Sequence, residues 1–186
     1  MTQEEVLQDF LSRLERFDIR YMVAGSYAAN QYAIPRATYD ADIVIEADEH
    51  TLRTLIRSLD VEFYADEIGA IDALRHSSIS SIVHKESGFK IDLVFLKDRR
   101  YSDYEFKRRS LRSFHGTQRW IASAEDTILT KLEWSKMGNS ERQFNDALNV
   151  AKVQADALDV NYLKTWAEDL GVTDLLERIL AHLAAS

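Results

Sequence analysis

Several residue types are missing or scarce in this chain, and each absence excludes a class of protein. The 186 residues include no cysteine, which rules out disulfide bridges and thiolate metal sites. No apolar run reaches the roughly 18 residues of a membrane-spanning helix, and the acidic, amphipathic start MTQEEVLQDF is unlike a signal peptide. There is one proline, and there is no low-complexity tract or repeat. We therefore expect a soluble protein without membrane contact, and a reducing cytoplasm fits this composition.

The chain also lacks an excess of positive charge. Its net charge of −8 disfavours a general nucleic-acid binder. The charge is uneven, because eight basic residues against three acidic ones give Lys97–Arg119 a net charge of +5 and leave −13 for the remainder. Two interpretations are open: the segment is the solvated face of a helix, or it is a strip that binds phosphates, with RNA as the expected partner.

Apolar residues, at 46% of the chain, are sufficient for a packed core, and their periodicity predicts a mixed sheet with helices. The Thr2-x-x-Glu5 capping box predicts the first helix. Glu86-Ser87-Gly88 predicts a turn that joins two strands into a hairpin. Strands are expected at residues 19–24, 41–46, 78–85 and 89–97, and helices at 26–33, 48–59 and 68–74.

From Ser123 onward the pattern is helical only. Two capping boxes, two further N-caps and one glycine stop predict four helices: Ser123-x-x-Asp126, Ser140-x-x-Gln143, Asp159, Thr173 and Gly171. The predicted class is therefore α+β, with a small mixed-sheet core at residues 1–122 and a C-terminal helical bundle at 123–186.

Three aspartates indicate the chemistry of a site. Asp40 and Asp42 stand two residues apart at the start of an apolar strand, so their side chains share one face and repel each other unless a cation lies between them. Asp92 lies inside a second apolar strand, where an ionised group needs a partner. If the two strands are neighbours, the three acids form one site for Mg²⁺, which prefers oxygen ligands and keeps positions open for phosphates.

A Gly-Ser pair precedes these acids. Gly25 and Ser26 follow a strand and open a helix, where free N–H groups attract an anion and the serine hydroxyl can donate to a phosphate oxygen. Ser26 as an ordinary N-cap is the alternative interpretation.

Together, Gly-Ser, Asp-x-Asp and the distant Asp resemble the DNA polymerase β-type nucleotidyltransferase superfamily. The stretch YAIPRATYDADIVI is similar to the Tyr…Arg-x-Thr-x-Asp-x-Asp run of bacterial minimal and AbiEii-like nucleotidyltransferases. SAEDTILTKLEWSK and SERQFNDALNV resemble their C-terminal helices. Many of those proteins belong to toxin–antitoxin or abortive-infection systems. The resemblance therefore implies an antitoxin or another partner protein as a candidate partner.

The resemblance implies a role for each residue. Asp40, Asp42 and Asp92 would hold two Mg²⁺ ions with a nucleoside triphosphate such as ATP, and Asp92 would help to deprotonate the attacking hydroxyl. The phosphate ligands would be Gly25, Ser26 and Lys131. Arg36 and Thr38 would orient phosphate or acceptor, or would only cap and pair their own loop. The acceptor hydroxyl would belong to RNA, a protein or a small molecule.

Two other functions use the same residues. The nucleotidyltransferase fold could serve as a catalytically inactive binding module, although the complete set of three acids disfavours this. DADIV also fits the nucleophile motif of Asp-dependent phosphatases. In those enzymes the acid follows a strand, whereas here the apolar run follows the acids, which disfavours the phosphatase interpretation.

Overall fold

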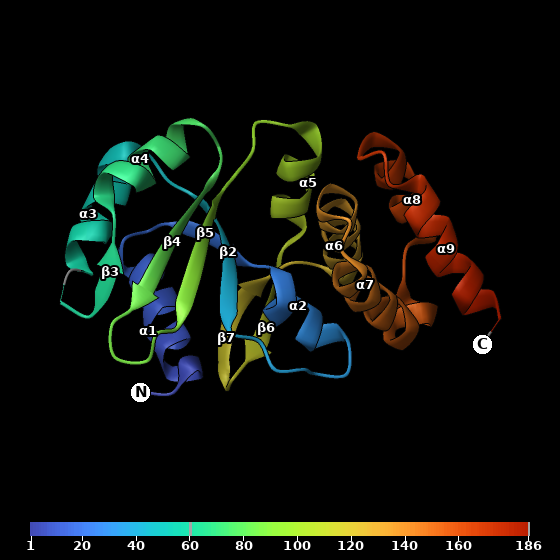
Figure 1. The fold of residues 1–186 in the computed structure, drawn as a ribbon, viewed down its shortest axis with the longest axis horizontal. Helices are drawn as coiled ribbons and strands as arrows, with labels where there is room; N and C mark the ends of the chain where they lie inside the picture. Colours follow the sequence, from blue (N-terminus) through green and yellow to red (C-terminus); the bar gives the residue numbers. More distant parts are fainter. Residues whose placement is uncertain (60, 186) are drawn as a thin grey trace. The chain divides into compact units, whose positions relative to one another are not determined.

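The structure is a computed structural model that describes residues 1–59 and 61–185, and its contacts divide the chain into two compact units (Figure 1). We call Met1–Val23 and Thr38–Ile121 the sheet unit. Ala24–Ala37 and the residues from Ala122 onward form the helical unit. The chain therefore leaves the sheet unit after Val23, returns at Thr38 and leaves it again after Ile121.

The sheet unit contains one mixed sheet. Its strands are β1 (Arg20–Val23), β2 (Asp40–Glu46), β3 (Phe63–Ala65), β4 (Ile79–His84), β5 (Lys90–Phe95), β6 (Ser110–Phe114) and β7 (Thr117–Ile121). They lie in the order β3-β4-β5-β2-β1-β7-β6. β2 runs parallel to β5 and β1 parallel to β7, whereas all other neighbours are antiparallel. β2 and β5, the two acid-bearing strands, are neighbours, which meets the condition that the sequence analysis set for a three-acid site.

β2 and β5 each present one apolar and one polar face, because side chains alternate along a strand. The apolar face is at most 1% exposed and consists of Ala41, Ile43, Ile45, Ile91, Leu93 and Phe95. The opposite face carries the acidic side chains. Burial of the first face fixes the register of these strands, since a slip of one residue would put the acids into the core.

Helices of the sheet unit complete its core. α1 (Gln3–Arg16) begins at the predicted capping box, in which Thr2 Oγ1 accepts from the Glu5 amide and Glu5 Oε2 accepts from the Thr2 amide. Its buried stripe includes Phe10, whose ring lies 6.1 Å from that of Phe63 in β3. α3 (Glu49–Ser58) and α4 (Glu67–Arg75) form where the sequence predicts helices, and they pack against each other.

β3 and the β6–β7 hairpin of the sheet unit go beyond the predictions, whereas α5 (Arg100–Arg108) is a helix within the basic segment, where a helix was one of the two interpretations. The hairpin turns at His115 and Gly116, which have φ angles of 47° and 81°. Two consecutive positive φ angles match the twist of a two-residue hairpin turn. His-Gly is a weak signal for such a turn, and the first four residues of β6 are not buried, so no apolar alternation marks this strand.

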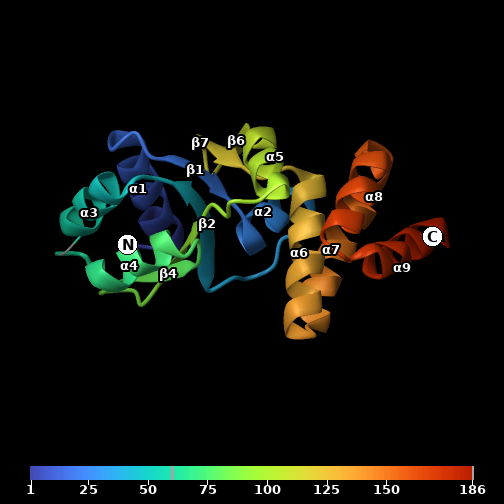
Figure 2. The ribbon, with the colours of Figure 1, turned by 90° about the horizontal axis from the view of Figure 1, so that it is seen from above.

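The helical unit consists of α2 (Gly25–Tyr32), α6 (Ala124–Gly138), α7 (Glu141–Gln154), the short 3₁₀ helix η1 (Ala155–Ala157), α8 (Val160–Asp169) and α9 (Thr173–Ala184) (Figure 2). α2 packs against α6 and α7. The Tyr32 hydroxyl donates to the carbonyl oxygen of Ala122 at 2.7 Å, and Gln154 Nε2 donates to the carbonyl oxygen of Tyr32 at 3.0 Å. A helix that lies early in the chain is thus part of the C-terminal helical packing.

The predicted caps of this unit are correct at three of four helices. Ser123, Ser140 and Asp159 each accept a hydrogen bond from the expected backbone amide. The prediction that Thr173 is an N-cap is wrong, because Val172 occupies that position and Thr173 is already helical. Gly171, with φ of 65°, ends α8, and the Val172 amide then bonds back to the carbonyl of Ala167, so α9 starts one residue early.

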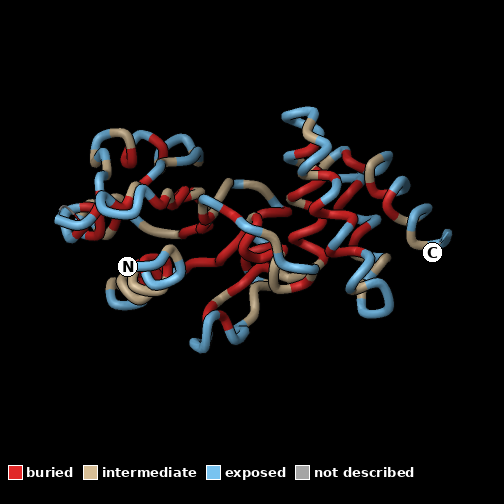
Figure 3. Tube along the Cα trace, turned by 60° about the horizontal axis from the view of Figure 1, so that its bottom comes forward, coloured by how far each residue is buried: buried red, intermediate tan, exposed pale blue. Residues whose placement is uncertain are grey.

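The predicted class, a mixed sheet with flanking helices followed by a helical region, is confirmed. Within each unit the buried positions lie inside, and the exposed ones lie mainly on turns and outer helix faces (Figure 3). The division into two units falls between residues 121 and 122, next to the predicted boundary. Residues 24–37 belong to the same unit as the C-terminal helices. The independence of the two parts as domains stays a prediction. Across residues 1–59 and 61–185, no helix is both long and apolar enough to span a bilayer.

Candidate functional site

The three acids of the sheet unit lie on one face of two adjacent strands. Asp42 of β2 and Asp92 of β5 are direct register partners, and Asp40 precedes Asp42 by two residues on the same face. Cα atoms of neighbouring strands are about 4.8 Å apart, so the side chains of Asp42 and Asp92 start close together. Asp92 is the more buried of these acids, with 8% of its surface exposed.

A lysine from the same face contacts two of these acids. Lys90 is the register partner of Asp40, and its Nζ lies 2.6 Å from Asp92 Oδ2 and 3.7 Å from Asp40 Oδ2. The hydrogen bond to Asp92 raises the pKa of Lys90, and the charges of Asp40 and Asp42 add to this effect. One ammonium group therefore already acts as a shared cation for two carboxylates.

Two hydroxyl groups hold the acids in place. Ser81 of β4 donates from Oγ to Asp92 Oδ1 at 2.6 Å. Thr38, which is buried, donates to the Asp40 carbonyl oxygen at 3.1 Å and approaches Asp40 Oδ1 at 3.4 Å. In this structure Thr38 thus orients the first acid, and Ser81 and Lys90 occupy both oxygens of the third.

The chemistry of this donor set fits a hard divalent cation. It offers only carboxylate oxygens, on a shared face and in register, and one cationic group already reaches Asp40 and Asp92 together. In the arrangement seen here, however, the described residues contain no group of three or more acidic or histidine side chains gathered around a common point. The residues are suitable as ligands, and Asp92 is engaged by Lys90 and Ser81 instead.

Gly25 and Ser26 form the start of α2 in the helical unit. Gly25 has φ of 57°, in the left-handed region that glycine adopts without strain, and no side chain caps the helix at Ala24. The alternative interpretation of Ser26 as an N-cap is therefore wrong, since Ser26 is the second helical residue. The helix start thus has the backbone geometry expected of an anion-binding turn.

A buried polar network surrounds the Ser26 hydroxyl. Arg36 Nη2 donates to Ser26 Oγ at 2.9 Å, and Lys131 Nζ donates to it at 3.3 Å. Both cations also bind Asp146 of α7: the Arg36 guanidinium makes two hydrogen bonds, at 2.6 and 2.9 Å, and Lys131 Nζ lies 3.1 Å from Oδ2. The two cations thus share the carboxylate of Asp146 and the hydroxyl of Ser26.

Asp146 is a residue that the sequence analysis did not assign to the site. Burial alone would raise its pKa, but the hydrogen bonds from Arg36 and Lys131, together with their charges, hold the pKa below its ordinary value. Its carboxylate is thus an ionised partner for both cations. A signal was present in the sequence, because Asp146 stands among the apolar positions of its helix, next to Ala147 and Leu148.

The predicted site residues thus form two groups, each inside one unit. Asp40, Asp42, Asp92 and Thr38 belong to the sheet unit, whereas Gly25, Ser26, Arg36 and Lys131 belong to the helical unit.

The basic segment Lys97–Arg119 is only partly available to a ligand. Arg119 is 4% exposed and donates to Gln8, Ser12 and Glu15 of α1, and the Arg109 guanidinium lies over the rings of Phe106 and Trp120. These two cations stabilise the sheet unit. The exposed cations of the segment are Arg100, Lys107 and Arg112.

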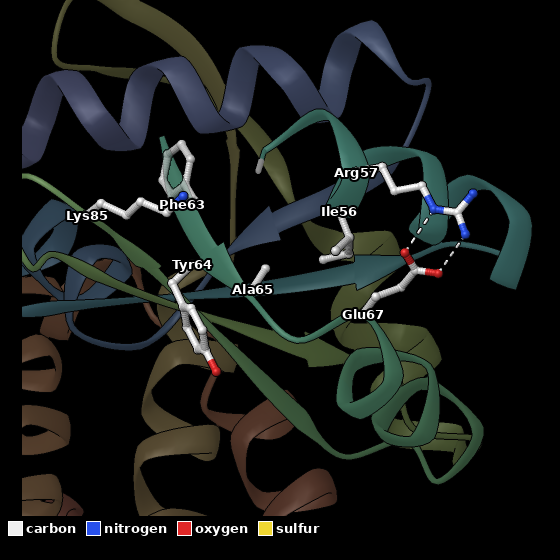
Figure 4. Close-up of a pocket in the computed structure, with 7 residues that line it drawn as sticks. All are labelled: Ile56, Arg57, Phe63, Tyr64, Ala65, Glu67 and Lys85. Atoms are coloured by element: carbon white, nitrogen blue, oxygen red, sulfur yellow. Dashed lines mark hydrogen bonds and ion pairs between the residues drawn. The ribbon is translucent and has the colours of Figure 1, made fainter. Parts of the chain in front are cut away.

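A pocket of about 300 Å³ lies elsewhere in the sheet unit, at β3 (Figure 4). Its lining consists of Ile56, Arg57, Phe63, Tyr64, Ala65, Glu67 and Lys85. Arg57 is bound to Glu67 by two hydrogen bonds. None of the predicted site residues lines this pocket, and we assign it no part in the site.

Comparison with known proteins identifies the fold. No protein-family model matches the chain, and no curated protein matches it. Solved structures do match: an antigenic nucleotidyltransferase-like protein from Paracoccidioides brasiliensis has a TM-score of 0.59 and 16% identity, over 96% of this chain and 92% of that one. The lincosamide antibiotic adenylyltransferase LnuA, lincomycin-bound, has a TM-score of 0.57 and 17% identity, over 82% and 98%. The structure of ANT(2'')-Ia in complex with adenylyl-2''-tobramycin has a TM-score of 0.52 and 13% identity, over 91% and 98%. The chain therefore has a nucleotidyltransferase fold, and the predicted resemblance to that superfamily is confirmed at the level of the fold.

Proposed function

We propose that this chain, which has a nucleotidyltransferase fold, is a Mg²⁺-dependent nucleotidyltransferase. It would transfer a nucleoside monophosphate from a nucleoside triphosphate to an acceptor hydroxyl and release pyrophosphate. The observation that supports this most directly is the register of β2 and β5, which pairs Asp42 with Asp92 and sets Asp40 on the same face. An apolar face that is fully buried keeps these acids on the opposite side of the sheet.

The acids of the sheet unit would have distinct roles. Asp40 and Asp42 would hold Mg²⁺ together with the triphosphate, and Asp92 would complete the ligand set and accept the proton of the attacking hydroxyl. When bound, Mg²⁺ would supply charge stabilisation for the entering and leaving oxygens of an in-line displacement. Thr38 and Ser81 would orient Asp40 and Asp92 through the hydrogen bonds described above.

The helical unit would contribute phosphate recognition. The start of α2 at Gly25, the Ser26 hydroxyl and the charge of Lys131 are the groups we assign to the triphosphate. Arg36 and Lys131 both donate to the Ser26 hydroxyl, and this placement of two cations at one hydroxyl group supports the role. We propose that Arg36 holds this network together.

The acceptor is proposed to be a small molecule with hydroxyl groups, and RNA is the second candidate. LnuA and ANT(2'')-Ia, which share the fold, are solved with lincomycin and with adenylyl-2''-tobramycin. RNA binding would depend on the exposed cations Arg100, Lys107 and Arg112 of the basic segment, since Arg109 and Arg119 are engaged in packing. A toxin–antitoxin setting remains an expectation from the sequence resemblance.

The experiment is a label-transfer assay. The protein is incubated with Mg²⁺ and each of the four α-³²P-labelled triphosphates, with lincomycin, tobramycin or total RNA as acceptor. We expect transfer of label to one acceptor class, and a loss on the order of 100-fold or more in Asp42→Asn. Glu46→Gln is the matched control, because Glu46 lies on the same face of β2 but pairs with Arg20 at the far end of the strand.

Calorimetry separates the enzyme from the inactive module. Transfer by the wild type that is unchanged in Asp42→Asn would contradict the assigned acids. Absence of transfer to every acceptor, together with absence of Mg²⁺–triphosphate binding, would favour the non-catalytic module. If RNA is the acceptor, Lys107→Glu and Arg112→Glu should weaken RNA binding more than they weaken triphosphate binding.

A further inference from the structure

The acidic face of the sheet unit carries its own cation. Lys90 belongs to the same strand and the same face as Asp92, and its ammonium group reaches Asp92 at 2.6 Å and Asp40 at 3.7 Å. The second oxygen of Asp92 accepts a hydrogen bond from Ser81 at 2.6 Å. Both oxygens of Asp92 are therefore occupied by groups of this chain, and a cation is already present among the acids.

The members of this arrangement differ in their freedom to move. The Asp92 side chain is 12% exposed, on a strand with neighbours on both sides, whereas the Lys90 side chain is 41% exposed. Lysine has a flexible four-carbon stem that can redirect its ammonium group without movement of the backbone. Lys90 can thus leave Asp92, while Asp92 stays in register with Asp42.

We infer that Lys90 is an internal substitute for the divalent cation. In the metal-free protein its ammonium group neutralises the acids. When Mg²⁺ and nucleotide bind together, the side chain turns and its ammonium group moves to the nucleotide phosphates. This inference rests on the proposed function. Metal alone must displace Lys90 from Asp92 and leave the ammonium group without a partner. Metal with nucleotide provides that partner, so the two ligands bind cooperatively, and each tightens the other by the same factor.

The same arrangement protects the metal-free fold. Asp40, Asp42 and Asp92 carry three negative charges on one face of two strands, and like charges at such positions destabilise a sheet. Lys90 relieves this repulsion in the absence of metal. Its removal should make the stability of the protein depend on Mg²⁺.

The test compares Lys90→Met with the wild type by isothermal titration calorimetry. Titration with MgCl₂ alone should show an affinity at least about tenfold higher in Lys90→Met, because a charged competitor for Asp92 is gone. Titration in the presence of a non-hydrolysable triphosphate analogue should tighten Mg²⁺ binding in the wild type and tighten it much less in Lys90→Met. Thermal unfolding should show a lower midpoint for metal-free Lys90→Met and a larger rise of the midpoint with MgCl₂.

Lys85→Met is the matched control. Lys85 lies next to the β4–β5 turn of the same hairpin, is exposed and donates to the carbonyl oxygen of Val61. Lys85→Met removes the same charge as Lys90→Met. We expect this variant to keep the wild-type affinity for Mg²⁺ and the wild-type coupling to the nucleotide analogue. An equal effect of both substitutions would overturn the inference, since net charge alone would then explain it.

The outcomes distinguish this inference from the proposed function. Tight binding of Mg²⁺ alone to the wild type, unchanged in Lys90→Met, would overturn the role of Lys90 and leave the proposed transferase intact. Cooperative binding that is lost in Lys90→Met supports the inference even if no acceptor is labelled. Absence of Mg²⁺ binding in both proteins, with and without the analogue, would overturn both proposals.

Discussion

Lys131 and Asp146 form a buried ion pair in the helical unit, with Nζ 3.1 Å from Oδ2 and side chains that are 5% and 8% exposed. Arg36 binds the same carboxylate from the loop after α2. One acid of α7 therefore neutralises a lysine of α6 and fastens the loop that follows α2. The contribution of Lys131 and Arg36 to the stability of the helical unit therefore depends on Asp146.

Asp146→Ala is expected to lower the free energy of unfolding by about 3 kcal/mol, because it leaves a buried lysine without its carboxylate. Urea denaturation measures this change. Arg142→Ala, at an exposed position one turn earlier in α7, is the control and should change stability by less than about 0.5 kcal/mol. Similar losses in both variants would show that Asp146 pairs along its own helix, as an ordinary Arg142–Asp146 pair would require.

Acid should weaken the helical unit through the same carboxylate. The pKa of Asp146 is lowered in the folded protein, so its contribution is complete above the unfolded pKa of about 3.9 and is lost as the pH falls through the folded value. Urea denaturation at several pH values between about 5 and 2 should show stability that falls with pH. Asp146→Asn should have a flatter profile in this range, and two parallel profiles would contradict the assignment.

Arg119→Met is expected to destabilise the sheet unit by about 2 kcal/mol, because the buried guanidinium joins β7 to Gln8, Ser12 and Glu15 of α1. Thermal or urea unfolding measures the loss. The control is Arg112→Met at the register partner of Arg119, which is exposed and should cost less than about 0.5 kcal/mol. If Arg112→Met were the more damaging change, the packing role of Arg119 would be refuted.

Gly25→Ala is expected to cost about 1 kcal/mol of stability, since an alanine at φ of 57° is strained. Gly138→Ala is the matched control: Gly138 is the last residue of α6, and an added Cβ would only reach Ser140 Cβ at 4.0 Å. That substitution should be neutral or should stabilise by up to about 1 kcal/mol. Equal effects of the two alanines in urea denaturation would contradict a special backbone requirement at Gly25.

The sequence was sufficient to predict the acid-bearing strands, but not that they are neighbours. Period-two alternation placed Asp40 with Asp42, and the hairpin pattern at residues 78–97 was borne out by the pairing of β4 with β5. The same alternation puts Lys90 on the face of Asp92. The sequence therefore also contained the signal for a cation beside the acids, although the sequence analysis did not name Lys90. The contact of Lys90 with Asp40 required the pairing of strands 50 residues apart, which no local pattern specifies.

Elements without local signals were missed. β6 carries exposed residues at Leu111 and Arg112 and gains its place by pairing with β7, and β3 is only three residues long. Arg109 and Arg119 looked like surface cations because composition does not reveal which charges are buried. Their partners, the rings of Phe106 and Trp120 and the polar residues of α1, come together only in the folded sheet unit.

The membership of α2 in the helical unit restricts how this protein can be dissected. A shortened chain that stops after residue 121 would keep α2 but would lose α6 and α7, the helices that cover it. Ala28, Ala29 and Tyr32, which are at most 5% exposed in the full chain, would then face water. Such a fragment should be prone to aggregation on expression, and studies of the sheet in isolation would need residues 24–37 to be replaced by a polar linker.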